Sequence, residues 1–155
     1  MKKTTGVNNV RVRISLEQAV RNIFFGKQYT GENYRRLYYI ARLLYPEVFS
    51  NIKRGQCPFC KKRFSSSRSV VIHLMASYDC KSKLNNCIET VIEMYRKYVR
   101  QIESRRRKKG TYYYVPTPYG KLRFTDIREA IKYAIYRGEK QAIWQKTLKE
   151  MMENA

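Results

Sequence analysis

Apolar side chains recur every three or four residues near the start of the chain, which is the spacing of an amphipathic helix. One such segment covers 14–26, where Ser15 is suited to cap the helix N-terminus. A second covers 31–46, where Pro46 is expected to end the helix. Together they predict an N-terminal helical hairpin within residues 1–53. A helix-turn-helix fits less well, because the connection is long.

The longest apolar repeat predicts a long helix over residues 85–110. Its apolar positions alternate spacings of four and three, a short heptad pattern made by Ile88, Ile92, Tyr95, Val99 and Ile102. Such a short repeat more often indicates packing within one chain than dimerisation, and a homodimer stays open as an alternative. The basic run Arg105–Lys109 is expected at the C-terminus of this helix, where cations are favourable.

The last third of the chain changes its periodicity. Side chains in 111–124 alternate around a Pro/Gly turn, which predicts a β-hairpin. Beyond it we expect two helices, one over 127–137 that Gly138 ends and one over 140–152. The predicted fold is mainly α with small β-hairpins. It divides into 1–53, 54–84, 85–110 and 111–155, which together form one integrated domain.

Charge narrows the choice of partner. The chain carries 33 Lys and Arg against 12 Asp and Glu, a net charge of +21 spread along its 155 residues. Nucleic acid is the expected partner of so basic a protein, ahead of a merely solvated basic surface or an anionic membrane. No apolar run approaches the roughly 18 residues of a membrane span, and no signal peptide is evident. We therefore expect an intracellular protein, in prokaryotic cytoplasm or in the nucleus of a eukaryote.

Four cysteines and the single histidine indicate a metal site. Cys57 and Cys60 form a CxxC turn, which presents two sulfurs to one zinc ion. Phe64, Val70 and His73 follow at spacings that resemble the two-cysteine, two-histidine zinc-finger family over about residues 54–80. The resemblance implies an embedded ββα finger that binds zinc, with Phe64 and Val70 as its small core.

The fourth ligand departs from that family, because no second histidine is present. Cys80 stands seven residues after His73 and would make a Cys-Cys-His-Cys site. A continuous helix would separate the two residues by about 10.5 Å along its axis, so the helix is expected to end near Ser77–Tyr78. Cys87 is the rival fourth ligand. A Cys80–Cys87 disulfide is the remaining alternative for a hyperthermophile.

The resemblance also assigns base contacts to the finger helix, at Ser66, Arg68, Ser69 and Ile72. The apolar residues Val71, Ile72, Leu74 and Met75 exceed what an isolated finger needs, so we expect its helix to pack into the larger domain and the metal to be primarily structural. The hairpin tyrosines Tyr112–Tyr114 and Tyr119 could stack on bases, although packing on a helix is commoner. The candidate nucleic-acid contacts are Lys61, Lys62, Arg63, Ser66, Arg68, Ser69, Arg105, Arg106, Arg107, Lys108 and Lys109.

These features favour a zinc-binding DNA-binding protein, either a transcription regulator or a genome-associated protein. RNA binding within a ribonucleoprotein is the first alternative, and a protein-interaction module acting on transcription machinery is the second. No enzyme is expected, because the only histidine is committed to zinc and a four-ligand site is closed. No small-molecule substrate is expected either. The chain resembles small zinc-finger proteins of viruses and plasmids of thermophilic archaea.

Overall fold

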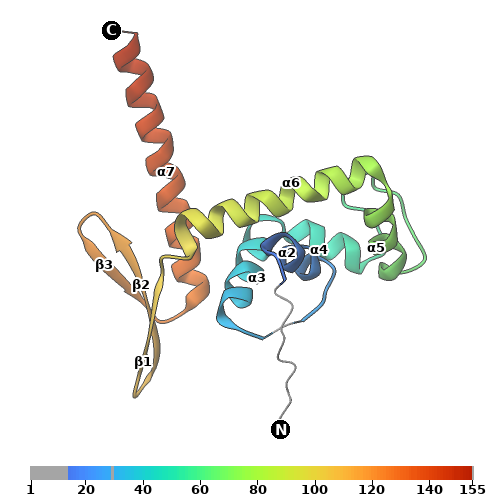
Figure 1. Cartoon of the computed structure of the whole chain (residues 1–155), viewed down its shortest axis with the longest axis horizontal. Helices are drawn as coiled ribbons and strands as arrows, with labels where there is room; N and C mark the ends of the chain where they lie inside the picture. Colours follow the sequence, from blue (N-terminus) through green and yellow to red (C-terminus); the bar gives the residue numbers. More distant parts are fainter. Residues whose placement is uncertain (1–13, 29, 155) are drawn as a thin grey trace.

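A long helix lies across a group of shorter helices and ends beside a small sheet and a protruding C-terminal helix (Figure 1). The structure is a computed structural model that describes residues 14–28 and 30–154. Its elements, in chain order, are α2 (Leu16–Phe24), α3 (Glu32–Leu44), α4 (Pro46–Lys53), α5 (Ser67–Ala76), α6 (Tyr78–Met94), a π-helical turn (Tyr95–Val99), β1 (Glu103–Arg107), β2 (Gly110–Thr117), β3 (Gly120–Phe124) and α7 (Ile127–Glu153).

The helical hairpin expected at the N-terminus is present. Ser15 caps α2 by accepting a hydrogen bond from the backbone amide of Gln18 at 3.1 Å. Pro46 follows the end of α3 and is the first residue of α4. Proline is favourable at this position because the amide of a first helical residue has no partner within the helix, so its absence costs nothing. The hairpin is therefore followed by a third helix, α4, which the sequence pattern did not separate.

Helix α6 forms the centre of the core. Its buried face, which includes Leu84, Ile88 and Val91, packs on the apolar sides of α2 and α3. All five residues of the short heptad repeat are buried, so the repeat serves packing within the chain. The predicted mainly helical fold is confirmed at this level.

The end of the long helix differs from the expectation. The helix begins at Tyr78, passes into the π-helical turn, and gives way to β1, so Arg105–Arg107 lie on a strand and not at a helix C-terminus. The buried guanidinium of Arg36 donates to the backbone carbonyls of Val99 and Ile102 at 2.9 and 2.8 Å. These hydrogen bonds satisfy carbonyls that a longer helix would use itself.

The three strands form one antiparallel sheet in the order β1-β2-β3. The expected hairpin is the pair β2 and β3, in which Val115 is paired with Leu122. The added strand β1 pairs with β2 and places Arg105 opposite Tyr112. Val115 is buried, and the Phe124 ring lies 5.4 Å from the ring of Tyr133 on α7. The sheet is thus attached to the core through α7.

The two expected C-terminal helices are a single helix, α7, which continues through Gly138. Its first half is held in the core by Ile127, Ala130, Ile131, Ala134 and Ile135. Beyond residue 140 every described side chain is exposed, and the helix extends away from the body (Figure 1). Among residues 14–28 and 30–154, no helix has both the length and the apolar character needed to cross a membrane.

Candidate metal centre

The CxxC turn is built on a tight backbone loop that follows α4. Gly55 opens it with φ +79°, and a Cβ at this position would lie 3.0 Å from the carbonyl oxygen of Phe64. Backbone hydrogen bonds join Phe64 N to Gly55 O at 2.7 Å and Cys57 N to Lys62 O at 2.9 Å. The expected finger hairpin is therefore reduced to a single bridge between Gln56 and Arg63 among the described residues.

The other two candidate ligands come from two helices. Ser66 caps α5 by accepting from the amide of Ser69 at 3.2 Å, and α5 carries His73 near its end. Ser77 then adopts an extended conformation with ψ 120°, and α6 begins at Tyr78. This single-residue break confirms the predicted helix end, and it places Cys80 in the first turn of α6.

The four expected zinc ligands are brought together. The donor atoms of Cys57, Cys60, His73 and Cys80 all lie within 4.8 Å of one another. The Cys60 sulfur lies 3.5 Å from Nε2 of His73. Donor atoms of a tetrahedral zinc site are about 3.3–3.8 Å apart, given bonds of about 2.3 Å to sulfur and 2.0–2.1 Å to nitrogen. The Cys60–His73 pair lies at this separation, and three sulfurs with one imidazole are a set of donors that suits zinc.

Cys87 lies outside this cluster. It is buried on α6, and burial raises the pKa of its thiol. All four cysteines are free thiols, so the chain has no Cys80–Cys87 disulfide. The geometry thus selects Cys80 over Cys87 as the fourth candidate ligand.

The thiols of the cluster have different environments. The hydrogen bond from the Lys62 backbone lowers the pKa of Cys60, which is exposed, whereas burial raises the pKa of Cys80 to about 11. Cys57 is fully buried and accepts a hydrogen bond from the Phe59 amide at 3.4 Å. Two of the three sulfurs are therefore held where a cation would compensate for lost solvation.

The expected core of the finger is present beside the cluster. Val70 is fully buried, and the Phe64 ring lies 4.9 Å from the ring of His73. Leu74 is buried, and Val71 packs partly against the core. Ile72 and Met75, by contrast, are each 57% exposed, so the expected packing of the finger helix holds for one side only.

The predicted nucleic-acid contacts do not form one surface. The first six, Lys61, Lys62, Arg63, Ser66, Arg68 and Ser69, lie in the loop after the CxxC turn and at the start of α5. The run Arg105–Lys109 lies on β1 and in the β1–β2 turn, near the other end of α6 (Figure 1). Ser66 and Ser69 are hydrogen-bonded to each other at 3.2 Å in the helix cap. Lys61 donates to the Pro58 carbonyl at 2.9 Å, and the Lys62 ammonium lies 5.6 Å from the Phe64 ring centre.

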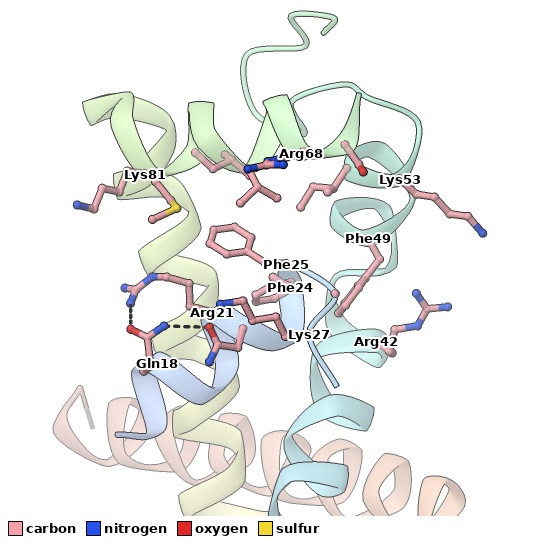
Figure 2. Close-up of a pocket in the computed structure, with 17 residues that line it drawn as sticks. Gln18, Arg21, Phe24, Phe25, Lys27, Arg42, Phe49, Lys53, Arg68 and Lys81 are labelled. Atoms are coloured by element: carbon pink, nitrogen blue, oxygen red, sulfur yellow. Dashed lines mark hydrogen bonds between the residues drawn. The ribbon is translucent and has the colours of Figure 1, made fainter. Parts of the chain in front are cut away.

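One group of cations could not be recognised from the sequence. A cavity of about 760 Å³, here called the basic pocket, opens between α2, α4 and α5 (Figure 2). The cations around this pocket come from five helices and one connecting segment, so no local sequence motif marks them. Of these cations, only Arg68 is among the nucleic-acid contacts expected from the sequence. The cations that line it are Arg21, Lys27, Arg42, Lys53, Arg68 and Lys81.

Comparisons of this chain with protein families, with curated proteins and with solved structures find no match.

Proposed function

We propose that the chain is a zinc-stabilised DNA-binding protein, acting as a transcription regulator or as a genome-associated protein. The observation that carries the proposal is a run of exposed cations where β1 turns into β2. Arg106, Arg107, Lys108 and Lys109 are exposed, and none of them forms an ion pair with a described carboxylate. On a chain of net charge +21, such cations lower their free energy by binding phosphates.

The neighbouring cation Arg105 is less available than the other four. It contacts both carboxylate oxygens of Glu103 at 3.1 Å, and its guanidinium lies 4.8 Å from the ring centre of Tyr114. Hydrogen bonds from Lys121 and Arg105 lower the pKa of Glu103, which therefore stays ionised and holds both cations. The candidate DNA surface is thus the β1–β2 turn and not the whole basic run.

We propose that zinc has a structural role in this function and binds near the other end of α6 from the β1–β2 turn. In our proposal residues 54–84 form a Cys-Cys-His-Cys finger in which the metal is held by Cys57, Cys60, His73 and Cys80. The support is the close approach of the four donor atoms. Four protein ligands would close the coordination sphere, which is typical of a structural zinc and not of a catalytic one.

The test measures binding of the zinc-loaded protein to duplex DNA and duplex RNA of equal length at several salt concentrations. The expected result is tighter binding to DNA, with log K falling linearly with log salt and each phosphate contact contributing roughly −0.9 to the slope. Tighter binding to RNA would assign the protein to the ribonucleoprotein class. Binding to neither polymer at low salt would overturn the proposal and favour a protein-interaction module.

A further inference from the structure

The basic pocket has an apolar floor. Its floor and walls carry aromatic and aliphatic side chains, and Figure 2 shows Phe25 near the middle of the cavity, with Phe24 and Phe49 beside it. Phe25 and Phe49 are only half-buried, so part of each ring faces the cavity. A volume of about 760 Å³ lies within the range of about 300–1,000 Å³ that is typical of pockets for small organic groups.

The margin of the same pocket is cationic on several sides. Figure 2 shows Arg68 above Phe25, Lys81 and Arg21 to one side, and Lys53 and Arg42 to the other. No Asp or Glu lines the pocket among the described residues, and none of its six cations forms an ion pair with a described carboxylate. An apolar cavity surrounded by uncompensated positive charge fits a ligand that is both flat and anionic.

Two of these cations, Arg21 and Arg42, are already held in place. Arg21 donates to Gln18 at 3.2 Å and to Asn85 at 3.1 Å, and Gln18 donates to Asn22 at 2.9 Å. The guanidinium of Arg42 lies 4.8 Å from the ring centre of Phe49. Arg68 lies in the first turn of α5, the helix that carries the candidate ligand His73. Arg21 and Arg42, held in this way, lose little conformational entropy when a ligand binds.

We propose that the basic pocket receives an unpaired nucleotide of a single-stranded segment. The base lies against Phe25, and the phosphates on either side contact Arg68, Lys53 and their neighbours. This inference rests on the proposed function and names the form of nucleic acid that the pocket accepts. A base in a duplex must first lose its stacking and pairing before it can enter a cavity, whereas an unpaired base can stack on an aromatic ring without this cost while its strand follows a cationic margin.

An acidic segment of a protein would meet the same positive charges. The nucleic acid is favoured because cations surround the aromatic floor on several sides, as a strand that enters and leaves the pocket requires. The two occupants are separated by the base itself. A strand that keeps its phosphates but lacks bases has the charge of the ligand without its flat apolar part, and polyglutamate has charge alone.

The experiment compares the zinc-loaded full chain on a single-stranded oligonucleotide, on the same strand with abasic positions, and on a duplex. We expect the intact strand to bind about 10-fold more tightly than the abasic strand, in line with the contribution of one stacked base. Phe25→Leu keeps an apolar side chain but removes the ring, so it should bring the intact strand to the affinity of the abasic one. Tyr136→Leu removes an exposed ring on α7, outside the pocket, and is the matched control that should change nothing.

A second arm tests the cationic margin. The double variant Lys53→Gln, Arg68→Gln should reduce the salt slope on the single strand by roughly 1.4, because two phosphates are no longer neutralised and each contributes about 0.7 on a single strand. The double variant Lys146→Gln, Lys149→Gln removes the same charge from the exposed end of α7 and should leave the slope nearly unchanged. Circular dichroism and thermal denaturation check that all variants are folded.

The outcomes separate this inference from the proposed function. Equal affinity for intact and abasic strands would overturn the pocket assignment, as would an unchanged affinity of Phe25→Leu for the intact strand. In either case, salt-dependent binding to the duplex would leave the proposed function standing. Displacement of the strand by polyglutamate of equal charge as effectively as by an intact strand would also overturn it and point to an acidic protein. Binding to no nucleic acid at all would overturn both.

Discussion

The aromatic ring of Tyr98 packs directly against the backbone of Gly138, in the space that a side chain at position 138 would occupy. Tyr98 lies in the π-helical turn that ends the α6 segment, and its hydroxyl donates to Oε2 of Glu139 at 2.8 Å. A glycine within a helix ordinarily weakens it. Here the missing Cβ allows α7 to cross the end of that turn at close range.

We expect Gly138→Ala to lower the free energy of unfolding by about 1–3 kcal/mol, because the new methyl group overlaps the ring of Tyr98. Chemical denaturation measures the change. In a Tyr98→Leu background the same substitution should be neutral or stabilising, since alanine favours a helix over glycine by about 1 kcal/mol. A single variant as stable as the wild type would contradict this contact.

The hydroxyl of Tyr98 is also expected to lose its proton at a higher pH than an ordinary tyrosine. Burial, and then the hydrogen bond to Glu139, raise its pKa to about 12, because both disfavour the phenolate. The folded state therefore binds this proton more tightly than the unfolded state. The resulting stability is fully present below the ordinary tyrosine pKa of about 10 and is lost as the pH rises through about 12.

The measurement is chemical denaturation at pH 9 and again near pH 11.5, for the wild type and for Tyr98→Phe. The wild type should lose more stability between the two pH values than the variant, which has no proton at this position to lose. Equal losses would show that the other tyrosines account for the whole effect. The difference spectrum of the two proteins at alkaline pH gives the Tyr98 titration directly.

One zinc ion should bind to each chain. Cys80→Ser is expected to abolish stoichiometric zinc, because the cluster then lacks its fourth donor, whereas Cys87→Ser should retain it. The two variants make the same chemical change seven residues apart on one helix, so each is the control for the other. Elemental analysis after dialysis measures the content, and a reversed pattern would identify Cys87 as the ligand.

Removing zinc should loosen more than the CxxC loop. His73 is on α5 and Cys80 is on α6, so the metal would fix the angle between two helices that a single extended residue joins. Zinc at 100 times its dissociation constant contributes about 2.7 kcal/mol to the folded state. Thermal denaturation with and without a chelator should show this loss, and amide exchange should rise in both helices. An unchanged melting temperature would contradict it.

Neutralising the exposed turn of the sheet should weaken binding to every DNA sequence alike. Changing Arg106, Arg107, Lys108 and Lys109 to Gln is expected to reduce the salt slope on two unrelated duplexes by about one for each phosphate that the variant no longer binds. Arg105→Gln is the control within the same run, because Glu103 already holds that guanidinium, and it should have a small effect. Equal slopes for all three proteins would remove this turn from the binding surface.

The parts of the structure that depend on local spacing could be predicted. The cap at Ser15 and the cluster of three cysteines and one histidine each follow from residues close in sequence, and the helix break before Cys80 was required by the rise of a helix. The end of the long helix could not be predicted in this way. It depends on Arg36, which lies more than sixty residues earlier and binds the last carbonyls, and on the pairing of β1 with β2.

The same limit explains the basic pocket. Arg21, Lys53 and Arg68 each belong to a different helix, and within its own segment each has the spacing of an ordinary solvated cation. Only the packing of those helices places them around one cavity. Gly138 is a case in which a local signal was misleading. Its sequence context predicted the end of a helix, but α7 continues through it, and the glycine accommodates the ring of Tyr98, which is distant in the sequence.

The uninterrupted course of α7 through Gly138 makes its outer half a rigid spacer. With a rise of about 1.5 Å per residue, Trp144 and Met151 lie about 9 and 20 Å beyond Gly138 along the helix axis, and both side chains are exposed. The distance and the direction of these two side chains from the core are therefore set by the helix and not by a flexible tether. One residue inserted between Gly138 and Trp144 would turn both side chains by about 100° around the helix axis.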